Sequence, residues 1–137
     1  MNLSKPLPLP HTILMVDDEP EHLKMQSWFM NEAGFRIITV VVGRNSFSLP
    51  DKERPGLILM DYRLNCELTS IQIVGLLRQT FKDVPIVLLS SAESMPEEMS
   101  PLVDGFIRKA DPEKLVEFAR KFFDGTGQRG QIASSSR

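Results

Sequence analysis

Five short apolar runs along the chain are separated by segments in which polar and apolar residues are mixed. The runs span residues 12–16, 36–42, 57–60, 85–89 and 104–108. Each is continuous and mostly β-branched or aliphatic, which is typical of a strand buried on both faces. Strands that alternate with helices form parallel sheets, connected by right-handed crossovers. We therefore expect an α/β fold, a small doubly wound sheet of five parallel strands with helices on both faces.

Three of the intervening segments, residues 21–33, 70–81 and 112–123, have the spacing of amphipathic helices. Asp111 is a candidate N-cap for the last of them. The segments 43–54 and 93–103 are interrupted by prolines and predict short or irregular helices. The side chains that this spacing places on the core faces are Met25, Trp28, Phe29, Ala33, Ile73, Leu76, Leu77, Phe81, Leu115, Phe118, Ala119 and Phe122.

Two end segments fall outside the alternating pattern. Residues 1–11 carry three alternating prolines, which favour an extended leader. Residues 124–137 are rich in glycine and serine and predict a disordered tail or a truncated linker. The folded domain is expected to span residues 12–123.

The net charge and the cysteine content exclude several kinds of function for this chain. The 137 residues include 16 Lys and Arg against 18 Asp and Glu, a net charge of −2. This balance provides no basic field for nucleic acid or for an acidic membrane surface. The single cysteine, Cys66, excludes an internal disulfide, and no Cys/His spacing is typical of zinc. The apolar runs are too short to cross a bilayer, so we expect a cytoplasmic protein without direct contacts to nucleic acid or membrane.

Polar residues follow four of the apolar runs at the point where each predicted strand ends. They are Asp17 and Asp18, Asp61, Ser90, and Lys109. Because parallel strands end at one edge of the sheet, these side chains should converge there. Three close carboxylates repel one another, and Mg²⁺ is a hard cation that would neutralise them. With Lys109 and Ser90 as partners for phosphate oxygens, the set suits phosphoryl transfer onto a carboxylate, with Asp61 as the best nucleophile.

The segments that carry these residues resemble the receiver domain of response regulators in two-component signalling. They read ILMVDDEP (13–20), LILMDYRL (57–64), PIVLLSSAE (85–93) and GFIRKADPEKL (105–115), in the family's order and spacing. The resemblance implies the flavodoxin-like fold with strand order 2-1-3-4-5. It also implies a signalling phospho-acceptor rather than an enzyme, with slow loss of its own phosphoryl group at most.

The resemblance implies the role of each residue in the acidic site. A sensor histidine kinase or a phosphotransfer protein would supply the phosphoryl group, and Asp61 would accept it. Asp18 would bind Mg²⁺ directly and Asp17 largely through water. Asp61 and the backbone carbonyl of Arg63 would complete the protein ligands.

The resemblance also implies a switch. Ser90 would be the hydroxyl that moves onto the phosphoryl group, Lys109 would pair with that group, and Phe106 occupies the family's aromatic switch position. The change would remodel the surface of the fourth helix, fifth strand and fifth helix, and so regulate a downstream protein. The protein would be a monomer or a phosphorylation-dependent dimer.

Two alternatives stay open at this point. The chain could be the receiver part of a longer regulator whose output domain is missing. It could also be an interaction module that keeps the acidic pocket without phosphorylation, because the loop at residues 65–70 departs from the family's pattern. Ala110 is a further departure, since the family commonly has proline there. The two histidines, His11 and His22, are expected to be solvated.

Overall fold

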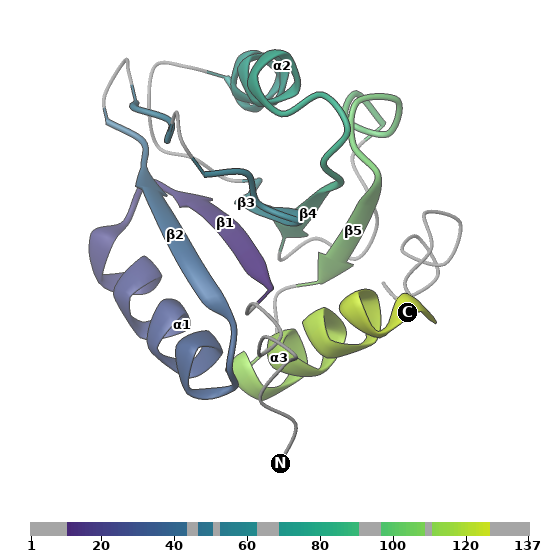
Figure 1. Ribbon diagram of the computed structural model, residues 1–137. Coiled ribbons are helices and arrows are strands. Elements are labelled where there is room, and N and C mark those ends of the chain that lie inside the picture. The colour runs from purple at the N-terminus through teal and green to yellow at the C-terminus, as the bar shows by residue number, and fades with distance from the viewer. Residues whose placement is uncertain are drawn as a thin grey trace.

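The computed structural model describes residues 11–43, 47–50, 53–62, 69–90, 97–108 and 111–126. Its centre is a five-stranded parallel sheet in the order β2-β1-β3-β4-β5 (Figure 1). The predicted doubly wound sheet and its strand order are therefore confirmed. The strands are β1 (Thr12–Asp17), β2 (Arg36–Val41), β3 (Leu57–Asp61), β4 (Ile86–Ser90) and β5 (Gly105–Arg108).

Helices cover both faces of this sheet. The helices α1 (Pro20–Glu32) and α3 (Pro112–Lys121) lie on one face, and α2 (Ser70–Thr80) lies on the other (Figure 1). The segment Phe122–Thr126 follows α3, and its Gly125 leaves helical geometry with a φ of 83°. In the described parts of the predicted irregular segments, residues 47–50, 53–54 and 97–102, the chain forms no helix. None of the helices in the described part of the chain has the length and apolar character that a membrane span requires.

The helix starts follow from local hydrogen bonding. Thr69 caps α2 in a capping box, since its hydroxyl accepts from the Gln72 N–H while the Gln72 side chain accepts from the Thr69 N–H. Asp111 caps α3 by accepting from the Lys114 N–H at 3.1 Å, and Pro112 fills the first turn. The predicted N-cap is thus confirmed.

The three central strands β1, β3 and β4 separate two apolar cores. Residues that alternate along β1 enter different cores, with Leu14 and Val16 on the α2 side and Ile13 and Met15 on the side of α1 and α3. All residues of β3 and β4 are buried. For these central strands the predicted burial on both faces is correct.

The edge strand β2 departs from that prediction. It pairs with β1 alone, and Val40 is its one buried residue. Val41 is 43% exposed although it belongs to a β-branched run. The apolar run indicates the strand correctly, but an edge position leaves part of its surface open, which the run alone does not reveal.

The buried face of α1 also differs from the predicted one. Its buried residues are Leu23, Gln26 and Met30, whereas Trp28 is 57% exposed and Met25 is 48% exposed. The helix is therefore rotated about its axis relative to the expected orientation, so the prediction of Trp28 and Met25 as core residues is wrong. The Trp28 ring instead packs edge-on against Phe29, with ring centroids 5.0 Å apart.

A smaller correction of the same kind applies to α2. Leu76, expected in the core, is 43% exposed. Val74 is buried with Ile73 and Leu77 instead. The helix thus buries three adjacent positions of its surface, and Leu76 lies at the border of that face.

We predict that Leu23→Ala and Trp28→Ala have unequal effects on stability. Leu23 is fully surrounded, so its truncation should lower the free energy of unfolding by about 3 kcal/mol. Trp28→Ala should lower it by about 1 kcal/mol or less, as expected for an exposed side chain. Urea denaturation measures both values. A larger loss for Trp28→Ala would show that the core-facing side of α1 is the one predicted from the sequence.

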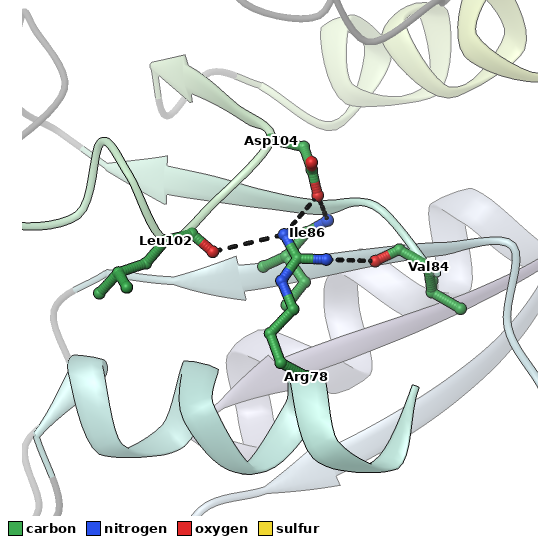
Figure 2. A network of polar contacts seen from close by, with 5 residues as sticks. All are labelled: Arg78, Val84, Ile86, Leu102 and Asp104. Atoms are coloured by element: carbon green, nitrogen blue, oxygen red, sulfur yellow. Dashed lines mark hydrogen bonds and ion pairs between the residues drawn. The ribbon is translucent and has the colours of Figure 1, made fainter. Parts of the chain in front are cut away.

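An ion pair at the amino ends of β4 and β5 fastens α2 to the sheet (Figure 2). The Arg78 guanidinium donates to Asp104 Oδ2 at 2.6 Å, to the Val84 carbonyl at 3.0 Å and to the Leu102 carbonyl at 3.3 Å. The same Asp104 oxygen accepts from the Ile86 N–H at 2.9 Å. One half-buried pair therefore joins the end of α2 to the starts of two strands.

We predict that Arg78→Met lowers the free energy of unfolding by about 2 kcal/mol, because it leaves a poorly exposed carboxylate without its cation. The matched control is Arg120→Met, since the Arg120 guanidinium makes one 3.4 Å bond to the Ala33 carbonyl at the exposed surface. The control should change stability by about 0.5 kcal/mol or less in the same urea titration. Equal losses in the two variants would contradict the role of the network.

Candidate functional site

Three polar side chains are buried at the carboxyl edge of the sheet. Asp17 ends β1, Asp61 ends β3 and Ser90 ends β4, and these strands are neighbours. The exposed fractions of the three residues are 2%, 6% and 1%. The register pairs Val16 with Met60, so Asp17 and Asp61 end adjacent strands at the same level. Parallel pairing thus brings together residues that are far apart in the sequence.

A group of metal-ligand type lies at this edge. One ligand atom each from Asp17, His22 and Asp61 lie within 4.8 Å of one another. The two carboxylates are the hard oxygen donors that Mg²⁺ prefers, whereas an imidazole suits softer cations. The carboxylate pair therefore fits the predicted ion. Asp18, predicted as the direct ligand, is half-exposed and lies outside this group of three.

The Asp17 carboxylate is held by a local hydrogen-bond network. Its Oδ1 accepts from the backbone N–H groups of Asp18 at 2.7 Å and Glu19 at 3.2 Å. Its Oδ2 is 2.5 Å from Nδ1 of His22, whose side chain is 27% exposed. The expectation that His22 is solvated is therefore wrong. A sequence signal for the contact exists, because a helix that starts at Pro20 places its third residue over the end of the preceding strand.

Burial raises the pKa of the Asp17 carboxyl above its ordinary value of 3.8. The hydrogen bond to His22 acts in the opposite direction, and the negative charge of Asp61 raises the pKa of Asp17 further. Two like charges in a buried setting therefore disfavour the ionised form of Asp17. A cation between the two carboxylates would relieve this cost.

We predict that Asp17→Asn raises the melting temperature by a few degrees at pH 7 in the absence of divalent cations. The folded-state pKa of Asp17 is raised, so its ionisation destabilises the fold at any pH above that pKa. Below the ordinary pKa of 3.8 the carboxyl is protonated in both states, and the advantage of Asn should vanish. Thermal melts between pH 3 and pH 8 measure this dependence.

The control for this prediction is Asp83→Asn, which changes an exposed carboxyl in the turn after α2. It should leave the melting temperature unchanged. Adding Mg²⁺ should stabilise the original chain more than Asp17→Asn. An advantage of Asn that is the same at every pH would show that ionisation of Asp17 is not the cause.

The predicted switch residues occupy neighbouring strands. Ser90 pairs with Arg108 in the β4–β5 register, and Leu88 pairs with Phe106. Phe106 is 2% exposed and belongs to the core on the α2 side. Two further predicted site residues, Arg63 and Lys109, lie outside the described residues, as does the unusual loop segment 65–68.

Tyr62, which directly follows Asp61, is a site residue that the sequence reasoning missed. Its N–H donates to the Leu89 carbonyl at 2.9 Å, and its own carbonyl accepts from the Ser70 hydroxyl at 2.7 Å. Its phenol donates to Glu98 Oε1 at 2.5 Å, which lowers the pKa of the Glu98 carboxyl. Tyr62 thus connects the end of β3 to β4, to α2 and to the turn that precedes β5.

Comparison with known families agrees with this architecture. A sequence profile of the response regulator receiver domain matches residues 13–120. The chain therefore belongs to the response regulator receiver family, whose members act in two-component signalling.

Curated relatives are transcriptional regulators of greater length. The chain is 28% identical to the transcriptional regulatory protein PrrA of Mycobacterium tuberculosis over 127 residues, which cover 90% of this chain and 53% of PrrA. It is 30% identical over 81 residues to the alkaline phosphatase synthesis transcriptional regulatory protein PhoP of Bacillus subtilis, covering 59% of this chain and 33% of PhoP. The chain thus spans about half the length of PrrA, and its match to PhoP covers about a third of that protein.

Solved structures share the fold. The chemotaxis response regulator CheY4 of Vibrio cholerae superposes with a TM-score of 0.63 at 22% identity, covering 82% of this chain and 98% of CheY4. A CheY-like receiver domain protein of Methanospirillum hungatei JF-1 gives a TM-score of 0.66 at 16% identity, covering 85% of this chain and 96% of that one. At these identities the likeness shows the fold.

Proposed function

We propose that this receiver domain is a phosphorylation-controlled switch in the cytoplasm that accepts a phosphoryl group on Asp61. The donor is a phosphohistidine of a sensor histidine kinase or of a phosphotransfer protein. The observation that carries the proposal is the burial of the Asp61 carboxylate beside Asp17 and Ser90 at one edge of the sheet. A second carboxylate and a hydroxyl, both buried, are the groups that such a transfer uses.

In the proposed step a carboxylate oxygen of Asp61 forms a bond to phosphorus. The N–P bond of the phosphohistidine breaks, and its electron pair returns to the donor's imidazole nitrogen. Bound Mg²⁺ would neutralise the charge of the carboxylates and the phosphoryl oxygens. The proposed ligands of that ion are Asp18, which would bind it directly, Asp17, which would bind it through water, Asp61, and the Arg63 backbone carbonyl.

The proposed switch then uses Ser90, Lys109 and Phe106. The Ser90 hydroxyl donates to a phosphoryl oxygen, and the Lys109 ammonium pairs with the same group. Movement of Ser90 frees space for Phe106, which lies two residues earlier in the register of the adjacent strand. The result is a population shift between two packings, which changes the surface of the turn at residues 97–102, β5 and α3.

This surface is the part of the molecule through which the switch would regulate a downstream protein. Binding could involve one copy of the chain or a phosphorylation-dependent dimer. Because PrrA is a transcriptional regulatory protein about twice as long as the matched segment, a receiver region within a longer regulator is a second form of the same proposal.

A specific observation favours one alternative. The His22 ring pairs with Asp17 at the position where a cation would otherwise balance the two carboxylates. A chain in which His22 satisfies Asp17 permanently would be a binding module that works without phosphorylation. The departures from the family's pattern in residues 65–70 agree with this alternative.

Intact-mass analysis after incubation with acetyl phosphate and Mg²⁺ tests the proposal. We expect the original chain and Asp83→Asn to gain one phosphoryl group, because Asp83 is an exposed carboxylate in the turn before the amino end of β4, away from the carboxyl edge of the sheet. Asp61→Asn should gain none, and chelation of Mg²⁺ should abolish the gain.

The alternative predicts a different pattern in the same assay. A folded original chain that gains nothing from several phosphodonors would contradict the proposed function. Recovery of phosphorylation in His22→Ala would then identify the His22–Asp17 pair as the block. Phosphorylation of Asp61→Asn to the same extent would instead move the acceptor to another residue.

A further inference from the structure

A small cavity adjoins the carboxylate site without including its carboxylates. It lies between α1, the ends of β4 and β5, and the first turns of α3, and has a volume of about 60 Å³. Its polar lining consists of His22 and Gln26 from α1, Arg108 from β5 and Lys114 from α3. Four side chains from three elements therefore converge on one space.

Gln26 is the unusual member of this lining. It is a polar residue on the buried face of α1, 8% exposed, and its amide has no hydrogen-bond partner among the described residues. No fully enclosed side-chain nitrogen or oxygen in the described part of the chain lacks a partner, so the Gln26 amide keeps some contact with solvent, and Gln26 is one of the residues that line the cavity. An amide that has no protein partner and still contacts solvent is free to hydrogen-bond a ligand.

The charge of the lining is positive. The Arg108 and Lys114 side chains have no ion-pair partner among the residues that the structure describes, and no acidic side chain lines the cavity. Two carboxylates that contact lining residues are already hydrogen-bonded, that of Asp17 to the His22 ring and that of Asp111 to the backbone N–H of Lys114. The amino end of α3 adds a positive dipole end on the same side.

The remaining walls are apolar. They consist of Leu89, Ile107 and Leu115, of which Leu89 is 5% and Leu115 is 6% exposed. The volume is far below the roughly 300–1,000 Å³ of pockets for drug-sized ligands. The space therefore suits one charged head group with a short apolar tail, and excludes a nucleotide.

We propose that this cavity is a binding site for a compact anion, a carboxylate or phosphate group that accepts hydrogen bonds from the Gln26 amide and pairs with Arg108 and Lys114. The site does not depend on phosphorylation, because Asp61 takes no part in it. The anion can come from a free small molecule or from an acidic side chain of a protein partner, and both present the same chemistry to these donors.

NMR titration of the isotope-labelled chain without Mg²⁺ tests the site, with the side-chain amide of Gln26 as the direct reporter. The probes are butyrate, inorganic phosphate and N-acetylglutamate methylamide, with butyramide as the neutral analogue of butyrate. We expect a saturable shift of the Gln26 amide with at least one anion and none with butyramide. A lower dissociation constant for butyrate or phosphate identifies a free small molecule, and a lower one for the blocked glutamate identifies an acidic side chain.

Matched variants assign the binding to the cavity. Lys114→Met and Gln26→Met should weaken binding by about five- to tenfold, the loss expected for one charge-assisted hydrogen bond. The controls are Lys82→Met and Gln79→Met, which remove the same groups from exposed positions away from the cavity. Lys114 is exposed, so its substitution keeps the test valid if Gln26→Met fails to fold.

Asp61→Asn separates this inference from the proposed function. It should retain anion binding while losing phosphorylation. The proposal is overturned if none of the anions gives a saturable shift, if butyramide binds as well as butyrate, or if Lys114→Met and Lys82→Met bind with the same dissociation constant.

Discussion

The parallel pairing of β1 with β3 places two carboxylates, Asp17 and Asp61, side by side at the ends of buried strands, and the rest of the site depends on this constraint. Neither residue can withdraw into solvent, since the four residues before each of them, residues 13–16 and 57–60, are buried. Hydrogen bonds offset part of the resulting repulsion, because backbone N–H groups at the start of α1 and the His22 ring bind the Asp17 carboxylate. Two carboxylates are thereby kept close together at this edge, and an added cation would lower the cost of their repulsion.

Charged side chains lie at both edges of the sheet. At the amino edge, the Arg78–Asp104 pair joins α2 to the starts of β4 and β5 with its charges matched (Figure 2). At the carboxyl edge, like charges remain close together. A fastened amino edge limits how far the starts of β4 and β5 can shift, so a change at Asp61 would be expressed beyond those starts, at Ser90, which ends β4, and at Phe106, which pairs with Leu88 in the middle of β4. Tyr62 provides a second connection from the end of β3 toward β5, because it hydrogen-bonds both to β4 and to the turn before β5.

The sequence predicted those parts of the fold that follow from continuous patterns. The five apolar runs became the five strands, and the residues after them converge because parallel strands share an edge. What it could not predict is the rotation of α1 about its axis. Trp28 and Leu23 are both apolar and both fit a helical repeat, and contacts with β2 and α3 decide which one is buried. The same orientation of α1 brings Gln26 to the cavity, which no sequence pattern indicated, whereas the contact of His22 with Asp17 could have been inferred from the helix start at Pro20. The roles of Arg63 and Lys109 stay predictions, since these residues lie outside the described part of the chain.

His22 gives the two sites a common wall. The His22 ring contacts the Asp17 carboxylate. The His22 side chain also lines the cavity, together with Gln26, Arg108 and Lys114. An anion bound in the cavity would contact the residue that orients Asp17, and a cation bound between Asp17 and Asp61 would compete for the carboxylate that orients His22. Thermodynamic linkage then requires the two effects to be equal. If a bound anion changes the affinity of the carboxylate pair for a cation by some factor, the bound cation must change the affinity of the cavity for the anion by the same factor. The rotation of α1 that the sequence did not reveal therefore places His22 between the two sites, where it would couple them.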